Sequence, residues 1–424
     1  MRAAAAALEE RPRQRWMMLA LLVGGLFFCY FHRSVLSVAA PFIIKDARLS
    51  PAAMGVLLSA FFWSYALAQV PAGWLADRYG VGRAYAAGFV VWAAAVMLTG
   101  LASTLTTLIL LRLMMGAGQG VAFPASSRAV ANWFPAAERG LATGTYLSGN
   151  RLGQAAITAM GGVFIAAYGW RSLFFWTGLA GVLWFVPWIW FHRRYARPSA
   201  ARVAPETVRA SAAGFSALVR DRRVAGVFLG FFAYDYAWYL LITWMPGYLM
   251  LERKFTAQEM ALYGSLPYLV TSVVAVATGI ASDAVVRRGF GDIAVRKWFI
   301  TVGMLLAALI VPAGMVDDRH LSVLLLGISV LGMGITAPNA WVLTQAVCGR
   351  ERAGVAAGIQ NLGGNLGGVL APALTGLVAQ LTGSFAIAFA IAGAILAAGI
   401  ASYWLLIPSG PPLSKRLDQQ VADR

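Results

Sequence analysis

The sequence predicts an all-α membrane protein whose twelve transmembrane helices form two six-helix bundles. Three observations support this fold class. Of the 424 residues, 60% are hydrophobic and only 12% are charged, which is too apolar for a soluble globule of this length. Apolar runs of about 20 residues recur along the whole chain. Motifs in the first half also recur in the second half.

The apolar runs are long enough to cross the hydrocarbon core of a bilayer as helices. They do not alternate with a period of two, and only helices or closed barrels satisfy every backbone polar group in lipid, so we predict helices. The first run is too long for a signal-peptide core and lacks a cleavage-like end, so it is a true span. The predicted spans are residues 16–43, 51–77, 84–103, 106–131, 140–168, 171–192, 223–250, 258–286, 297–316, 320–347, 353–380 and 384–407.

Basic residues are unevenly distributed over the connecting loops. The chain has 34 Lys and Arg against 17 Asp and Glu, a formal charge of +17 that could suggest a nucleic-acid partner. With both termini placed in the cytoplasm, most of these residues fall in cytoplasmic loops, which is the positive-inside rule and argues against nucleic acid. The only long loop, residues 193–222, is basic and separates an N-terminal bundle, 1–192, from a C-terminal bundle, 223–424.

The two bundles carry related motifs at a slowly increasing offset, which indicates one ancestral unit with loop insertions. Because each copy holds an even number of spans, both copies cross the membrane in the same direction. The matching stretches are Phe27–Tyr30 with Phe231–Tyr234, Gly73–Asp77 with Gly279–Asp283, and Gly118–Pro124 with Gly332–Pro338.

The loop Gly73–Gly80, followed by Arg83, resembles the signature loop between spans 2 and 3 of the major facilitator superfamily. Further stretches resemble its anion:cation symporter branch, which includes bacterial sugar-acid transporters and the vesicular glutamate and sialic-acid carriers. These stretches are Cys29–Arg33, Ser59–Tyr65, Arg112–Pro124 and Asn132–Pro135 with Glu138 and Arg139. The resemblance implies the major facilitator fold, with a substrate site near the midplane between the bundles.

The resemblance also implies a secondary active transporter of a small organic anion, such as a sugar acid, an aromatic acid or a di- or tricarboxylate. We expect it to act by alternating access, as a monomer in the lipid bilayer of a bacterial cytoplasmic (inner) membrane. A multidrug exporter would favour acids over arginines in its cavity. A non-transporting receptor would be expected to carry an extra signalling domain, and both alternatives fit less well.

Three arginines, Arg33, Arg112 and Arg151, lie inside predicted spans. A guanidinium stays charged at physiological pH, and insertion scales put its cost at the bilayer centre at roughly 2.5–3.5 kcal/mol. We therefore expect each one to meet a negative partner, which we interpret as the transported anion. In the resembled branch, the position of Arg33 contacts the substrate carboxylate. Arg151 could bind a second negative charge of the substrate, or pair with Asp235 or with helix carbonyls.

Polar side chains complete the expected substrate site. Tyr30 lies one turn from Arg33, and Gln119 lies two turns from Arg112 on the same helix face. The alternative for the amides is helix-to-helix hydrogen bonding, worth only about 0.6 kcal/mol each. The other expected substrate contacts are Tyr65, Asn150, Tyr239, Asn339, Asn361 and Asn365.

The usual proton carriers of the resembled branch are missing, because His32 and Gln119 stand where its members have acids. His32, which titrates near neutral pH in water, and Asp235 are the candidates left for proton coupling. Proton-coupled uptake is the prediction. Facilitated diffusion or anion exchange without proton coupling is the alternative.

The signature loop also predicts a conformational latch made by Gly73, Asp77, Arg78 and Arg83, with Asp283 in the second copy. In the resembled family this cluster holds the cytoplasmic side shut in one state. The alternative is that these charges only set the topology.

No catalytic chemistry is expected. The three histidines and two cysteines are scattered, so the sequence predicts no metal site, no cofactor and no enzyme. The run Gly116-x-Gly118-x-Gly120 lies inside an apolar span and follows no strand, so it is not a dinucleotide-binding motif.

Overall fold

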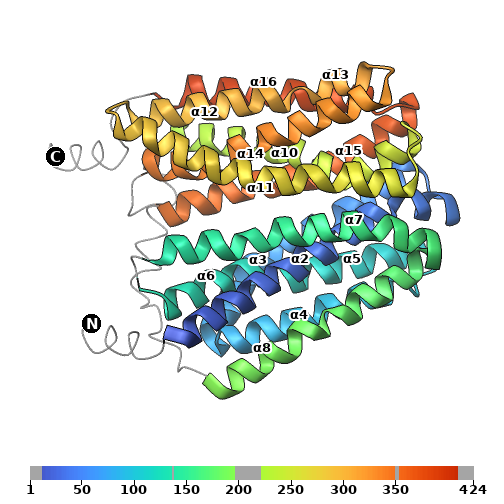
Figure 1. Cartoon of the computed structure of the whole chain (residues 1–424), viewed down its shortest axis with the longest axis horizontal. Coiled ribbons are helices and arrows are strands. Elements are labelled where there is room, and N and C mark those ends of the chain that lie inside the picture. Colours follow the sequence, from blue (N-terminus) through green and yellow to red (C-terminus); the bar gives the residue numbers. More distant parts are fainter. Residues whose placement is uncertain (1–11, 136–137, 196–220, 349–352, 409–424) are drawn as a thin grey trace. The chain divides into compact units, whose positions relative to one another are not determined.

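The computed structural model describes residues 12–135, 138–195, 221–348 and 353–408 (Figure 1). Most of the predicted linker loop, residues 193–222, lies outside this described part. Helices occupy nearly all of the described residues, and no strand occurs among them. The predicted all-α class is confirmed.

Eleven helical stretches of the described chain are long and apolar enough to cross a membrane. The longest, Leu141–Tyr195, contains Gly169 with φ 78° and ψ 161°, a conformation that favours glycine and breaks the helix. The two predicted spans 140–168 and 171–192 meet there. Counted separately, they bring the total to the twelve spans that the sequence predicts.

The chain divides by its contacts into two compact units. One contains Met1–Arg202 and Met245–Tyr268, and the other contains Val203–Trp244 and Leu269–Arg424. Residues 245–268, which the repeat assigns to the second bundle, thus pack with the first unit. A Cβ on Gly162 would lie 2.9 Å from the carbonyl oxygen of Ala257, which shows how closely this segment approaches. The division into bundles 1–192 and 223–424 stays a prediction.

The first unit begins with helices whose ends carry clear sequence signals. Ser50 accepts a hydrogen bond from the N–H of Ala53 at 3.2 Å and caps α3, and Thr104 caps α5 by accepting from Thr107. The predicted span 106–131 is divided into α5 and α6. Pro124, which has no N–H to donate, lies in the first turn of α6. The helices of this unit are α2 (Pro12–Asp46), α3 (Pro51–Tyr79), α4 (Val81–Thr99), α5 (Leu105–Gln119), α6 (Ala122–Trp133), α7 (Arg139–Ala180) and α8 (Val182–Tyr195).

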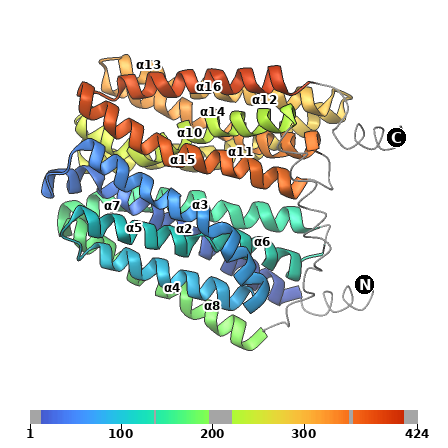
Figure 2. The same ribbon diagram turned by 180° about the vertical axis from the view of Figure 1, so that it is seen from behind.

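Helices α2 and α7 pack against each other along much of their length (Figures 1 and 2). Glycines allow this approach. A Cβ on Gly149 would lie 2.3 Å from the carbonyl oxygen of Val23, and a Cβ on Gly153 would lie 2.1 Å from that of Phe27. Small residues at such interfaces let helices in lipid gain van der Waals contact. This packing fixes the backbone of α2 in the two turns that precede Arg33.

The second unit has the same helical character. The predicted span 297–316 is divided into α12 and α13. The helices of the second unit are α10 (Arg222–Leu251), α11 (Ala257–Arg287), α12 (Asp292–Ala307), α13 (Ile310–Met315), α14 (Arg319–Cys348), α15 (Ala353–Thr382) and α16 (Ala386–Leu406). The end of α10 and the start of α11 belong to the first unit.

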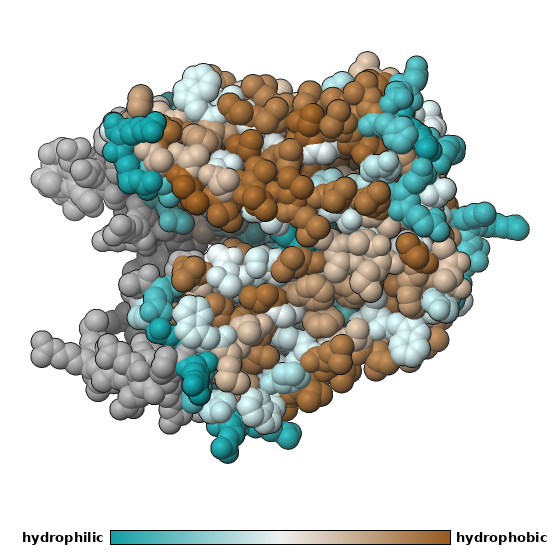
Figure 3. Space-filling view, in the orientation of Figure 1, coloured by the Kyte–Doolittle hydropathy of each residue, from teal (hydrophilic) through white to brown (hydrophobic). Residues whose placement is uncertain are grey.

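Helix α11 exposes an apolar face. Val273, Val276 and Ile280 are each more than 60% exposed. In Figure 3 apolar residues cover the middle of the surface over α11 and α12, and hydrophilic residues gather at the helix ends. This distribution is that of a surface whose solvent is lipid.

Candidate anion-binding site

Arg33 lies on α2 with only 3% of its surface exposed, surrounded by aromatic rings. Its guanidinium carbon is 4.4 Å from the ring centres of Tyr30 and Phe61 and 4.7 Å from that of Tyr65. The negative faces of these rings stabilise a cation in an apolar setting. The sequence-predicted residues Tyr30, Arg33 and Tyr65 are therefore neighbours in the first unit.

Arg112, on α5, lies directly beside Arg33. Its Nη2 donates to the carbonyl oxygen of Arg33 at 3.0 Å, and its Nη1 is 3.1 Å from the sulfur of Met115. Its Nε is buried and has no hydrogen-bond partner in the described structure. Among the described residues, no carboxylate lies within ion-pair distance of Arg112.

Three acids of the first unit lie at helix ends, and each of them pairs with a basic residue. The pairs are Asp46 with Arg171 at 2.6 Å, Asp77 with Arg128 at 3.4 Å, and Glu138 with Arg15 at 3.2 Å. The centre of this unit is therefore rich in fixed positive charge.

Gln119, fully buried on α5, occupies the space between α5 and the arginine of α2. Its Nε2 donates to the carbonyl oxygen of Cys29 at 2.9 Å, which fixes the orientation of the amide. Its Oε1 therefore faces Arg33, and both Nε and Nη2 of Arg33 lie 3.3 Å from it. The neutral amide oxygen of Gln119 thus occupies the position in which a carboxylate would neutralise the charge of Arg33.

Asn150 and Arg151 lie on α7, half-buried, next to the glycines that pack against α2. The Oδ1 of Asn150 is buried and accepts no hydrogen bond in the described structure. Arg151 lies within electrostatic reach of Tyr268 in the same unit. The two roles of Arg151, binding the substrate and pairing with Asp235 or with helix carbonyls, stay predictions.

His32 is fully buried and binds two neighbours through its ring nitrogens. The indole N–H of Trp92 can only donate, so Nδ1 of His32, 3.3 Å away, accepts. The carbonyl oxygen of Thr177 can only accept, so Nε2 of His32, 2.8 Å away, carries the proton. If Nδ1 were protonated, its N–H would face the indole N–H of Trp92, and neither donor would have an acceptor. This geometry therefore favours a neutral ring and disfavours His32 as a proton carrier.

Asp235, in the second unit, is 8% exposed on α10 and lies against α15. A Cβ on Gly364 would lie 2.0 Å from its Oδ2, so only glycine leaves room for the carboxylate. Tyr239 follows one turn later on α10 and is equally buried. These two sequence-predicted residues thus share one region of α10.

The predicted asparagines of the second unit fall into two places. Asn361 and Asn365 are neighbours on α15, where Nδ2 of Asn365 donates to the carbonyl oxygen of Asn361 at 2.9 Å. Asn339, on α14, instead accepts from Nη1 of Arg296 at 3.3 Å and donates to the carbonyl oxygen of Ile335 at 2.9 Å. The structure therefore places Asn339 in a charged cluster.

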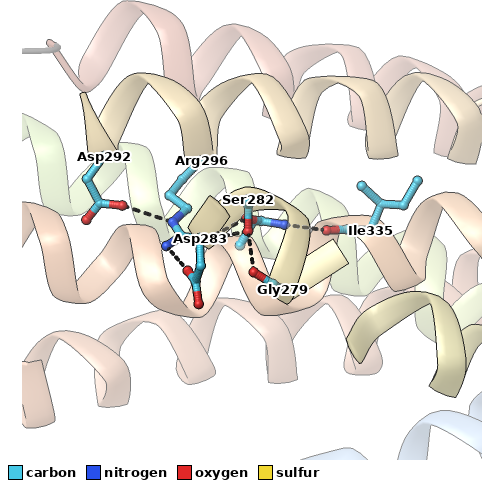
Figure 4. Close-up of polar contacts among 7 residues, drawn as sticks. Gly279, Ser282, Asp283, Asp292, Arg296 and Ile335 are labelled. Carbon is cyan, nitrogen blue, oxygen red and sulfur yellow. Dashed lines mark hydrogen bonds and ion pairs between the residues drawn. The ribbon is translucent and has the colours of Figure 1, made fainter. Parts of the chain in front are cut away.

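Figure 4 shows this cluster, which surrounds Arg296 of α12. The guanidinium is 5% exposed and binds Asp283 of α11, the Oγ of Ser282 at 2.5 Å and Asp292 at 3.0 Å. With Asn339, these contacts tie α11, α12 and α14 together. Arg296 stands 213 residues after Arg83, close to the repeat offset, so aligning the copies could have predicted it.

The signature loop of the first unit has a looser arrangement. Asp77 pairs with Arg128 of α6, a partner that sequence reasoning did not name. Arg78 stacks 5.1 Å from the ring of Trp74, and Arg83 is exposed. Gly73 faces Pro124, whose Cβ would lie 3.7 Å from an added Cβ. The acid of each copy is thus paired with an arginine of its own unit.

A multi-pass bundle of apolar helices that buries permanent cations is the architecture of a membrane transporter. The chain belongs to the Major Facilitator Superfamily, whose family model matches residues 22–372. A bacterial homologue of the human lysosomal transporter Spinster, solved in an inward-facing and occupied conformation, superposes with a TM-score of 0.77 at 18% identity, covering 92% of this chain and 96% of that one. At this low sequence identity, the structural similarity to the Spinster homologue shows a shared fold.

Three relatives are named as transporters of organic acids. The chain is 31% identical to the D-galactonate transporter of Escherichia coli O6:H1, covering 83% of this chain and 86% of the relative. It is 30% identical to the probable sulfoacetate transporter of Cupriavidus necator and 29% identical to a probable galactarate/D-glucarate transporter of Escherichia coli K12, with 84% and 85% of this chain covered. The predicted likeness to anion transporters of the superfamily is confirmed.

Proposed function

We propose that this protein carries a small organic carboxylate across a membrane by alternating access. The observation that supports this most directly is Arg112, a buried guanidinium beside Arg33 with an unused Nε donor and no carboxylate at ion-pair distance in the described structure. A buried charge is stable only when it is paired. A bound carboxylate supplies the missing charge and accepts the unused hydrogen bond.

The substrate class follows from the donors and acceptors of the site. Arg33 and Arg112 bind the anionic head. Tyr30, Tyr65 and Asn150, in the same unit, read the remaining groups. Tyr239, Asn361 and Asn365 of the second unit stay predicted substrate contacts. The printed substrates of the relatives, D-galactonate, sulfoacetate and galactarate or D-glucarate, are all small organic acids.

The orientation of the chain follows from the distribution of charge. The basic loops favour both termini in the cytoplasm, and the relatives are bacterial, so we place the protein in a bacterial cytoplasmic membrane, with uptake as the proposed direction of transport. Proton coupling falls to Asp235, because the hydrogen bonds of His32 hold it neutral. Exchange or facilitated diffusion is the competing mode.

The test combines binding and transport by the purified protein. A thermal-shift screen against a panel of sugar acids, aromatic acids and di- and tricarboxylates should find acids that raise the melting temperature, and Arg112→Gln should abolish the shift. The same acids should be taken up by proteoliposomes. A panel in which neutral sugars stabilise the protein and no acid does would refute the proposal.

A further inference from the structure

Helix α8 has a buried face and an exposed face. On the buried face, the indole N–H of Trp188 donates to the carbonyl oxygen of Gly82 at 3.1 Å, which ties α8 to α4. On the other face, Val186 and Trp190 are 59% and 51% exposed. Because α8 lies at the outer edge of the first unit (Figures 1 and 2), this exposed face contacts the lipid of the membrane.

The exposed face of α8 carries a groove of about 460 Å³. Residues four apart in a helix lie on the same side, so the described residues that line the groove form two adjacent rows. The rows are Phe185, Ile189 and Arg193 in one and Val186, Trp190 and Arg194 in the other. Each row therefore begins with two apolar side chains and ends in a guanidinium, with both guanidiniums at the same end of the groove.

The groove has the length of one leaflet of a bilayer. From Phe185 to Arg194 the helix rises about 14 Å, at 1.5 Å per residue, and one leaflet is about half of a hydrocarbon core of ~30 Å. The arginines directly precede the basic linker, at the end of α8 that the distribution of charge places in the cytoplasm. The ring of Trp190 packs 6.0 Å from that of Tyr195, an aromatic pair typical of the level of the lipid headgroups.

The two arginines of the groove are exposed, and among the described residues no carboxylate lies within ion-pair distance of Arg193 or Arg194. Other arginines of the same unit, such as Arg15 and Arg171, do pair with acids. A phosphate matches the planar, multiple donors of guanidinium groups. Basic residues immediately cytoplasmic of a transmembrane helix attract anionic lipids.

We propose that this groove binds an anionic glycerophospholipid, with its phosphate at Arg193 and Arg194 and an acyl chain along the apolar part. Both parts of the groove support this occupant. A soluble anion would leave the apolar side chains without a partner, and an uncharged lipid would leave the guanidiniums without one. The site uses none of the residues proposed to bind the transported anion.

The experiment compares two phospholipids with identical acyl chains. Phosphatidylglycerol, which is anionic, and phosphatidylethanolamine, which is zwitterionic, are added to the full-length protein in detergent. Binding is measured by native mass spectrometry and by the rise in melting temperature. The wild type should prefer phosphatidylglycerol. The double substitution of Arg193→Gln and Arg194→Gln should weaken its binding by about thirtyfold, because each basic residue near an anionic lipid surface contributes about 1 kcal/mol.

Two control variants separate this site from a general attraction to positive charge. The double substitution of Arg287→Gln and Arg288→Gln removes the same charge from the end of α11 and should leave phosphatidylglycerol binding unchanged. Trp190→Ala keeps the charge but removes part of the apolar wall, so it should weaken both lipids and keep their ratio. All these side chains are exposed, so the variants should fold, and the melting temperature without added lipid checks this.

Three results would overturn the lipid site. Equal binding of the two lipids by the wild type, or an equal loss in the two double variants, would mean that the arginines of α8 recognise no particular lipid. Unchanged lipid binding in Trp190→Ala would mean that the apolar part holds no acyl chain. Displacement of the lipid by soluble glycerol phosphate would identify a site for free phosphate in place of a lipid site.

Discussion

Trp92 donates its indole N–H to Nδ1 of His32 across 3.3 Å, which joins α4 to α2 immediately beside Arg33. The other ring nitrogen of His32 joins α2 to α7 through the carbonyl oxygen of Thr177. His32, which the sequence suggests as a proton carrier, thus connects three helices through its hydrogen bonds. It holds the segment of α2 from which Arg33 projects.

The first prediction concerns this connection. His32→Ala removes both hydrogen bonds and leaves the buried N–H of Trp92 unsatisfied, which costs about 1–3 kcal/mol. We expect a lower melting temperature in detergent, whereas the dependence of uptake on pH in the remaining folded protein stays as in the wild type. Trp92→Phe, which removes one bond of the two, should lie between. A pH profile that flattens in His32→Ala would restore His32 as a coupling residue.

The second prediction concerns Asp235. Asparagine has nearly the same shape and fits the space opposite Gly364, but it cannot carry a proton. In proteoliposomes, Asp235→Asn should therefore lose the stimulation of uptake by an inward proton gradient and keep exchange of internal for external substrate. Stimulation that survives in this variant would rule out Asp235 and support a mode without proton coupling.

A third prediction concerns Arg33. Lysine keeps the positive charge but offers a compact ammonium in place of a planar group that stacks between rings and donates through several N–H groups. Arg33→Lys should fold normally and bind its acid on the order of tenfold more weakly, measured by calorimetry. Equal affinity would show that only the charge at this position matters.

A fourth prediction tests the packing of α2 against α7. An added methyl group at Gly153 would meet the backbone of Phe27, so Gly153→Ala should cost about 1–3 kcal/mol or prevent insertion. Gly144 on the same helix has nothing within 4 Å of an added Cβ, so Gly144→Ala is the matched control and should be tolerated. Expression level and melting temperature of the two variants should differ clearly.

The fifth prediction concerns the ion pair of Asp77 with Arg128. Asp77→Ala breaks this ion pair and leaves Arg33 and Arg112, the arginines proposed to bind the anion, in place. We expect slower transport with an unchanged ranking of ligands in the thermal-shift panel. An altered ranking would mean that the pair shapes the binding site and is not a latch.

Several features of this protein are local, and the sequence predicts them well. Whether a run of residues crosses a membrane depends on its own length and apolar character, because lipid leaves its backbone no other hydrogen-bond partners. The twelve spans and the helical class follow from this. Repeat and motif together identify the superfamily, since Gly73–Gly80 carries the signature loop and its Gly-x-x-x-Asp spacing recurs at Gly279 and Asp283.

The partners of individual side chains are not local. Asn339 has the helix position of a cavity residue, yet Arg296, 43 residues away in sequence, holds its amide. Gly144 and Gly153 lie on the same helix, but of the two only Gly153 meets another backbone.

By itself, the sequence determined that this chain is a twelve-span helical transporter with buried arginines and without the acids usual in its branch. Tertiary structure decided that Arg33 and Arg112 adjoin, that Gln119 turns its oxygen toward Arg33, and that His32 is held neutral. The physical reason is that insertion depends on the composition of each span alone. The charge and hydrogen bonding of a site, in contrast, depend on which faces of distant helices are packed together.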